Sequence, residues 1–250
     1  MAMNVLEIST PDGTCRTALF GQGPGVILIQ DAGGPRNALF GMAEQMAAAG
    51  FCVAVPDLMY RVGNPFDLLP HGTPHDAGLF LQSMRNDPEF RKQLTEKYVK
   101  SANSPENVKR DFTAILSALK QHCAPGRVRV TGYCMGGGIA LRAAGLFPDD
   151  ICAAASFHGG YLAHPGPDSP HLSLPNARAE IFVAGAQEDP SFPDEMKTRL
   201  EETLKSTKLT WRVETWPGRH GFAVTDFPVF DAALGKRHLD ELIALFKRTS

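Results

Sequence analysis

Short apolar runs recur along this chain, and several of them are continuous rather than alternating. Residues 26–30 read VILIQ, residues 51–55 read FCVAV and residues 151–157 read ICAAASF. Continuous runs of this length are typical of parallel strands that are buried on both faces of a sheet. Further strands are predicted at residues 5–8, 14–20, 128–131, 180–184 and 209–215, the first two as a hairpin that turns at 11–13.

Helical segments separate these strands. Helices are predicted at residues 38–49, 105–118, 137–144, 196–205 and 232–247. Strands that alternate with helices predict an α/β fold, a doubly wound and mostly parallel sheet with helices on both faces. We expect a single domain over residues 1–250. An irregular, lid-like excursion interrupts it at about residues 60–104, where proline and glycine precede a charged helical stretch.

The stretch 128–145, VRVTGYCMGGGIALRAAG, changes from strand to helix within a few residues. Its turn has the form G-x-C-x-G, which is the nucleophile-elbow pattern G-x-S-x-G with sulfur in place of oxygen. An elbow holds its central residue in a strained backbone conformation, so that this side chain stands alone above the sheet. Gly132 and Gly136 fit the pattern because strand and helix nearly touch there.

Cys134, at the centre of this turn, is a candidate nucleophile. Its thiol would lie at the positive end of the following helix, which favours the thiolate. The N–H of Met135 would point at the oxyanion that forms on an attacked carbonyl group. Free cysteines are also common core residues, so the motif alone leaves a structural cysteine open.

Composition narrows the functional classes. The chain has 250 residues, a formal net charge of -2 and 43% hydrophobic residues, which suit a globular protein with a sizeable core. It has no basic run, so we expect no nucleic-acid partner. No apolar stretch approaches the roughly 20 residues of a membrane helix, and the N-terminus lacks a signal-peptide pattern.

The chain has five cysteines and no C-x-x-C pair. This odd count favours reduced thiols and a cytoplasmic location over a disulfide framework. Four of the cysteines are interpreted as structural residues: Cys15, Cys52, Cys123 and Cys152.

Side chains with catalytic chemistry follow the predicted strands. In a doubly wound sheet, ligands bind at the carboxyl ends of the strands. A nucleophile, an acid and a histidine also occur here in the chain order expected of α/β-hydrolases. The residues that directly follow a predicted strand or lie in its exit loop are Asp31, Cys134, His158, Asp189 and His220.

Several separate segments share one known pattern. They are G-Y-C-M-G-G at 132–137, G-A-Q-E-D-P at 185–190, G-R-H-G-F at 218–222, P-D-L at 56–58 and Q-D at 30–31. With these segments the chain resembles the dienelactone hydrolase family of the α/β-hydrolase superfamily. The resemblance covers nearly the whole chain and is weakest between residues 60 and 104. It is specific, because three separately placed motifs agree in order and context.

The resemblance implies a catalytic triad. Cys134 would be the nucleophile, His220 the general base and acid, and Asp189 the carboxylate that orients His220. Glu188, beside Asp189, is an alternative acid. The N–H of Ala32 would be the second oxyanion donor. The implied activity is that of a carboxylic ester hydrolase that opens small lactones or esters through an acyl-enzyme and needs no metal or organic cofactor.

The chain departs from the family pattern at two positions. The acidic residue that contacts the thiol in the family is usually Glu, and here it is Asp31, which is one methylene shorter. The arginine that binds the substrate carboxylate, four residues beyond the histidine, is replaced by Val224. The candidates to substitute for it are Arg61, Arg85 and Arg91 of the excursion.

Other residues have open roles. Tyr133 and Met135 flank the nucleophile and are expected to shape the substrate pocket. His158 either lines that pocket or is a satisfied loop histidine. His71 and His75 could bind a metal ion, but no third ligand at zinc-like spacing accompanies them, so we expect a solvated loop.

Two alternatives to hydrolysis stay open. One is a family member that binds a small ligand without turning it over, as the departures at Asp31 and Val224 suggest. The other is a redox or transferase activity of Cys134, in which Cys52 or Cys152 would be a second thiol close in space.

Overall fold

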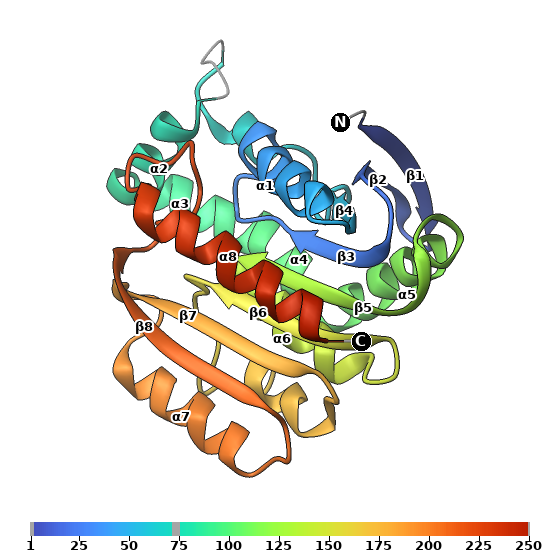
Figure 1. The fold of residues 1–250 in the computed structure, drawn as a ribbon. Coiled ribbons are helices and arrows are strands. Elements are labelled where there is room, and N and C mark those ends of the chain that lie inside the picture. Colours follow the sequence, from blue (N-terminus) through green and yellow to red (C-terminus); the bar gives the residue numbers. More distant parts are fainter. Residues whose placement is uncertain (1–2, 72–75, 250) are drawn as a thin grey trace.

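One eight-stranded sheet forms the centre of the molecule (Figure 1). The structure, a computed structural model, describes residues 3–71 and 76–249. The strands lie side by side in the order β1-β2-β4-β3-β5-β6-β7-β8. Their bounds are β1 (Asn4–Thr10), β2 (Gly13–Phe20), β3 (Pro24–Ile29), β4 (Cys52–Pro56), β5 (Ala124–Tyr133), β6 (Ile151–Phe157), β7 (Glu180–Glu188) and β8 (Trp211–Arg219).

The doubly wound, mostly parallel sheet expected from the sequence is confirmed. All strand pairs from β4 through β8 are parallel, whereas β1 pairs with β2, and β2 with β4, in antiparallel fashion. Two of the strands that run past their predicted ends bear on the site: β7 continues to Glu188 and β8 to Arg219. These extensions bring Asp189 and His220 to adjacent positions at the same edge, since Glu188 pairs with Arg219.

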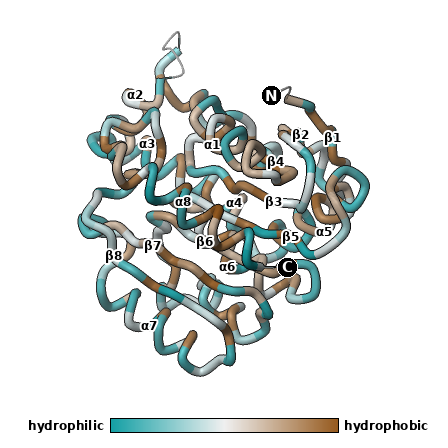
Figure 2. The backbone as a smooth tube through the Cα atoms, in the orientation of Figure 1, coloured by the Kyte–Doolittle hydropathy of each residue, from teal (hydrophilic) through white to brown (hydrophobic). Residues whose placement is uncertain are grey.

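Helices cover both faces of the sheet. Alternate residues of β3 show the division: Val26 and Leu28 belong to the same buried cluster as residues of α1 and α8, while Ile27 and Ile29 belong to the cluster that includes residues of α5, α6 and α7. Figure 2 shows the hydrophobic stretch of β3 inside the molecule. The bounds of these helices are α1 (Asn37–Ala48), α5 (Pro105–His122), α6 (Met135–Leu146), α7 (Asp194–Lys205) and α8 (Ala232–Arg248).

The excursion between residues 60 and 104 is mainly helical, and four of its aromatic side chains are buried: Phe66, Phe80, Phe90 and Tyr98. It also borders the loops that follow β3 and β8. A Cβ atom on Gly34 would lie 3.7 Å from Pro65, and one on Gly78 would lie 3.9 Å from Pro228. A lid at this place stays a prediction. The elements are η1 (Pro65–Leu68), α2 (Ala77–Asn86), α3 (Pro88–Gln93), the π-helical η2 (Leu94–Val99) and α4 (Lys100–Asn103).

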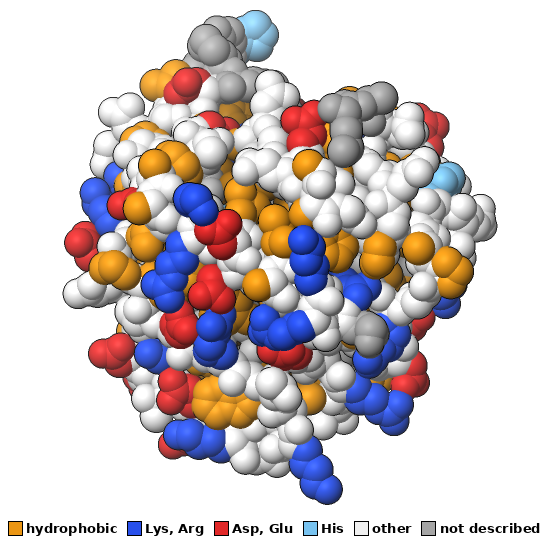
Figure 3. Space-filling model, viewed as in Figure 1, with side chains coloured by type: hydrophobic (Ala, Val, Ile, Leu, Met, Phe, Trp, Pro, Cys, Tyr) orange, Lys and Arg blue, Asp and Glu red, His pale blue; other side chains and the backbone are white. Residues whose placement is uncertain are grey.

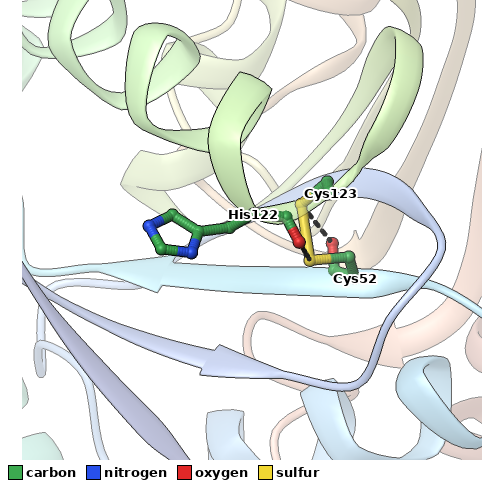
Figure 4. Close-up of a disulfide and its surroundings, with 3 residues drawn as sticks. All are labelled: Cys52, His122 and Cys123. Carbon is green, nitrogen blue, oxygen red and sulfur yellow. Dashed lines mark hydrogen bonds between the residues drawn. A yellow bond between two sulfur atoms is a disulfide. The ribbon is translucent and has the colours of Figure 1, made fainter.

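A disulfide joins Cys52 to Cys123 (Figure 4). Cys52 is the first residue of β4 and Cys123 directly follows α5, and their Cα atoms are 5.6 Å apart. The expectation that these two thiols are reduced is therefore wrong, and the cysteine count no longer argues for a reducing compartment. Cys15, Cys134 and Cys152 are free.

The surface carries charges of both signs. On the face seen in Figure 3, basic and acidic side chains are interspersed and form no patch of one sign. Among the described helices, none is long and apolar enough to cross a membrane.

Candidate active site

Cys134 occupies the turn between β5 and α6 with a backbone φ of 53° and ψ of -118°. A positive φ is strained for a residue with a side chain, and strain of this kind concentrates at functional sites. The surrounding glycines permit the turn. A Cβ atom on Gly132 would lie 1.9 Å from the carbonyl oxygen of Gly136, and one on Gly136 would lie 2.4 Å from that of Gln30. The strand and helix therefore meet as closely as the elbow pattern predicts.

His220 and Asp189 form a hydrogen-bonded pair at the ends of β8 and β7. Nδ1 of His220 lies 2.6 Å from Oδ2 of Asp189, whose side chain is only 1% exposed. Nδ1 is thereby occupied, which leaves Nε2 of the imidazole for the hydrogen bond with Cys134. Glu188, the alternative acid, is 73% exposed and pairs with Arg219 instead.

The pKa of His220 connects this pair to Cys134. Burial of the imidazole lowers its pKa, but the adjacent Cys134 sulfur raises it by charge and by a hydrogen bond, and Asp189 raises it further. The net result is a pKa of His220 well above its usual value. A histidine that contacts a cysteine sulfur and a carboxylate can exchange a proton with the sulfur.

Two backbone N–H groups bear on the oxyanion site expected from the sequence, those of Met135 and Ala32. Met135 is the first residue of α6, so its N–H has no partner within the helix. Ala32 lies in the loop after β3, where Asp31 accepts hydrogen bonds from Gly33 at its carboxylate and from Gly34 at its carbonyl oxygen. Within the described part of the chain, neither N–H donates to another protein group. Both N–H groups can therefore donate to a bound ligand.

Asp31 is engaged away from the thiol. Its two carboxylate oxygens accept hydrogen bonds of 2.8 and 3.0 Å from Arg36, and one of them also accepts from the N–H of Gly33 at 2.7 Å. Among the described residues, no contact joins Asp31 to Cys134. The family's acidic contact to the thiol is thus replaced here by an ion pair with Arg36.

His158 lies beside His220, with their ring centroids 5.3 Å apart. Its side chain is fully buried, and neither ring nitrogen has a hydrogen-bond partner among the described residues. Burial, and then the charges of His220 and His238, hold its pKa well below the usual value. His158 is therefore a neutral imidazole packed beside His220.

Tyr133 does not lie where we expected. Its side chain is fully buried, stacks on Phe157 and shares a 2.7 Å hydrogen bond with His238 of α8. The hydroxyl therefore faces the core rather than a pocket. The strand turns its side chains to alternate faces, and the one after Gly132 faces α8.

In the described part of the chain, the three arginines considered as substitutes for a cation at position 224 make no contact with Asp189 or His220. Val224 is fully buried. Arg61 is committed to Asp12 and Asp111, and Arg91 donates to the carbonyl oxygen of Met84. Arg85 lies on the exposed side of α2, where the structure gives it no contact with the triad.

Two residues at the site had escaped the sequence reasoning. Ser191 donates both its N–H and its hydroxyl to Oδ1 of Asp189, at 2.9 and 2.6 Å. The order Asp-Pro-Ser is a turn signal that could have indicated this contact. Arg36 binds Asp31 and also Asp226, 190 residues further along the chain, and no local pattern predicts that pairing.

No described group of three or more acidic, histidine or cysteine side chains could hold a metal ion. His75, named above as a possible ligand, lies outside the described residues. A second thiol near Cys134 is also missing from the described part. Cys52 is bonded to Cys123, and Cys152 lies at the start of β6, whereas Cys134 donates its N–H to Phe157 at the end of that strand.

The sequence is similar to those of several known proteins over most of its length. The carboxymethylenebutenolidase homolog of Mus musculus is 29% identical over 205 residues, which cover 80% of this chain and 71% of that protein. Protein usf of Aquifex pyrophilus is 30% identical over 195 residues, or 76% of this chain and 69% of that protein.

The fold agrees with solved structures as well. The crystal structure titled "Putative Dienelactone Hydrolase" from Klebsiella pneumoniae superposes with a TM-score of 0.81 at 18% identity, covering 99% of this chain and 98% of that one. The sheet and its helices thus have the α/β-hydrolase fold. The dienelactone hydrolase family matches residues 13–250. From its fold and from this match, the chain belongs to the dienelactone hydrolase family.

Proposed function

We propose that this protein is a cysteine hydrolase that cleaves small lactones or carboxylic esters through an acyl-enzyme. The observation that carries the proposal is the position of His220, which bonds Asp189 through Nδ1 and has its pKa raised by the Cys134 sulfur. A general base between a carboxylate and a nucleophile is the arrangement that acyl transfer requires. Membership of a hydrolase family supports the same reaction class.

The reaction begins with attack of the Cys134 sulfur on the carbonyl carbon. The N–H groups of Met135 and Ala32 hold the oxyanion of the tetrahedral intermediate. His220 gives the proton on Nε2 to the departing alkoxide as the carbon–oxygen bond breaks, and a thioester remains on Cys134. His220 then takes a proton from a water molecule, which attacks the thioester and releases the acid and the thiolate.

We further propose that the acyl part of the substrate is uncharged. Val224 stands where family members carry an arginine for the substrate carboxylate. All five N–H groups of Arg36 are occupied by Asp31, Asp226 and the carbonyl oxygen of Gly34. Two carboxylates share the one guanidinium, which leaves a net negative charge, so this side of the site disfavours a further anion.

Mass spectrometry of the intact protein, after brief mixing with activated esters and small lactones, tests the proposal. We expect a transient acyl adduct on Cys134 that is absent in Cys134→Ala and persists in His220→Ala. If uncharged donors and donors with a carboxylate both leave no adduct, the protein is instead a family member that binds a ligand without turnover. Faster labelling by carboxylate donors than by neutral ones would contradict the uncharged substrate.

A further inference from the structure

Arg36 joins two loops of the candidate active site through ion pairs with buried Asp31 and half-buried Asp226. Its guanidinium donates two hydrogen bonds to the carboxylate of Asp31 and two to that of Asp226, at distances of 2.7 to 3.0 Å. It also lies over the ring of Phe227, 5.1 Å from the ring centroid. We call Asp31, Arg36 and Asp226 the arginine clamp.

The clamp holds the peptide that carries an oxyanion donor. Asp31 directly precedes Ala32, and its carboxylate accepts the N–H of Gly33 at 2.7 Å. A Cβ atom on Gly33 would lie 2.9 Å from Nη1 of Arg36, so the guanidinium packs directly against this backbone. The direction of the Ala32 N–H is therefore set by groups that Arg36 binds.

The other end of the clamp belongs to the histidine loop. Asp226 lies six residues after His220, in a run of turns closed by backbone hydrogen bonds from Phe222 to Arg219, Val224 to Gly221 and Phe227 to Val224. Movement of Asp226 would consequently move the loop that holds His220. Bidentate pairs between arginine and carboxylate are directional, which suits them to fix one loop against another.

We propose that Arg36 is a positioning residue, and that the arginine clamp fixes the Ala32 N–H at the oxyanion position relative to Cys134 and His220. This inference rests on the proposed function, because only acyl transfer builds an oxyanion there. It assigns Arg36 no contact with the substrate.

Two reactions of the same thiol separate this role from others. Acylation by a neutral activated ester forms a sulfur–carbon bond through an oxyanion, and the alkoxide or phenoxide leaves. Alkylation by iodoacetamide forms a sulfur–carbon bond by displacement of iodide and builds no oxyanion. The ratio of the two rates at Cys134 therefore reports the oxyanion position, while the alkylation rate alone reports the reactivity of the thiolate.

We expect Arg36→Gln to lower the acylation rate by about 10- to 100-fold, since loss of one oxyanion donor costs up to about 10²–10³ in rate. Its alkylation rate should stay within about twofold, a bound that follows from a thiolate–imidazole pair left intact. Arg36→Lys, which keeps the charge but not the bidentate geometry, should recover part of the acylation rate. Asp226→Asn should lower acylation in the same direction, and it is the milder variant because Asp226 is 33% exposed.

Arg61 provides a matched control. Arg61 is 12% exposed and Arg36 is 13% exposed. Each bridges two aspartates, of which one is 1% exposed: Arg61 bridges Asp111 and Asp12, and Arg36 bridges Asp31 and Asp226. Arg61→Gln should therefore affect thermal unfolding much as Arg36→Gln does, without changing the ratio of acylation to alkylation.

The outcomes are distinct. An unchanged ratio of acylation to alkylation in both Arg36→Gln and Asp226→Asn would overturn the clamp. Equal falls in the two rates would also overturn it, because they would place the effect on the thiolate–imidazole pair. A wild-type protein that is alkylated at Cys134 but acylated by no ester would overturn the proposed function, and the clamp's role with it.

Discussion

The hydroxyl of Ser191 donates a 2.6 Å hydrogen bond to Oδ1 of Asp189, the carboxylate oxygen that His220 does not use. Together with the Ser191 N–H, this bond fixes the plane of the carboxylate. The orientation of the imidazole therefore depends on a residue outside the triad.

We predict that Ser191→Ala lowers kcat for ester hydrolysis by about tenfold, because a hydrogen bond to a charged group contributes about 1.5–3 kcal/mol and one of the two Ser191 bonds remains. KM should change little. Ser191→Thr, which retains a hydroxyl, should recover most of the activity, and Asp189→Asn should be far more severe, with a loss of roughly 10³-fold or more. Steady-state kinetics would count against this role if Ser191→Ala matched the wild type.

Acid sensitivity follows from two buried histidines. Burial lowers the pKa of His238 to about 3 and, with nearby charges, that of His158 well below its usual value. In the unfolded chain both would titrate near pH 6.5. Below that pH the unfolded state binds more protons, so the free energy of unfolding falls as the pH drops from about 6.5 towards 3.

Relative to neutral pH, each histidine should lower the free energy of unfolding at pH 5 by about 2 kcal/mol. This figure follows because pH 5 lies about 1.5 units below the unfolded pKa and each unit is worth about 1.4 kcal/mol. Urea unfolding at pH 7.5 and pH 5.0 measures the loss. His238→Gln cannot be protonated but can still bond the Tyr133 hydroxyl. This variant should lose about 2 kcal/mol less than the wild type between the two pH values, which is the contribution of one histidine. An equal loss in wild type and variant would show that His238 is not responsible.

Two glycines should respond in opposite ways to alanine. A Cβ atom on Gly132 would lie 1.9 Å from a backbone oxygen, and nothing there can move without opening the elbow. We expect Gly132→Ala to destabilise the protein by about 3 kcal/mol or more. Gly41, inside α1, has nothing within 4 Å of such an atom, so Gly41→Ala should stabilise by about 0.5–1 kcal/mol. Thermal unfolding of the two variants gives the comparison, and a stable Gly132→Ala protein would be incompatible with this elbow.

The disulfide should support the fold and leave the chemistry alone. It closes a loop with a sequence separation of 71 residues, and a crosslink of that span stabilises by up to about 4 kcal/mol in the chain-entropy account. Reduction should lower the urea midpoint of the wild type but not that of the Cys52→Ser/Cys123→Ser double variant. Alkylation of Cys134 should proceed at the same rate in both proteins, and a changed rate would indicate that the crosslink reaches the active site.

The sequence was sufficient for features that depend on local patterns. Buried parallel strands can be recognised in the sequence as continuous apolar runs. The elbow can be recognised by two glycines that lie within five positions of one another. The positions of Asp189 and His220 followed from their places after strands, although their contact could be stated only once β7 and β8 were seen to pair.

Features that depend on distant segments were not predictable. The clamp joins residues 190 positions apart, and the disulfide could have formed between any two of five cysteines. Tyr133 shows a third limit. Its neighbours indicated the elbow, but which face of the sheet receives its ring depends on α8, almost a hundred residues later.

The strand order also has a consequence for synthesis on the ribosome. β3 pairs with β4 on one side. On its other side it pairs with β5, so Ile27 has no strand partner until Val130 has been synthesised. At about 5–20 residues per second, roughly 5–20 s pass while this apolar edge is made but unpaired. Such an edge invites association between chains, so the nascent protein is most exposed to aggregation before its nucleophile has been synthesised. His220 follows the last strand, so its contact with Asp189 can form only when nearly the whole chain has emerged.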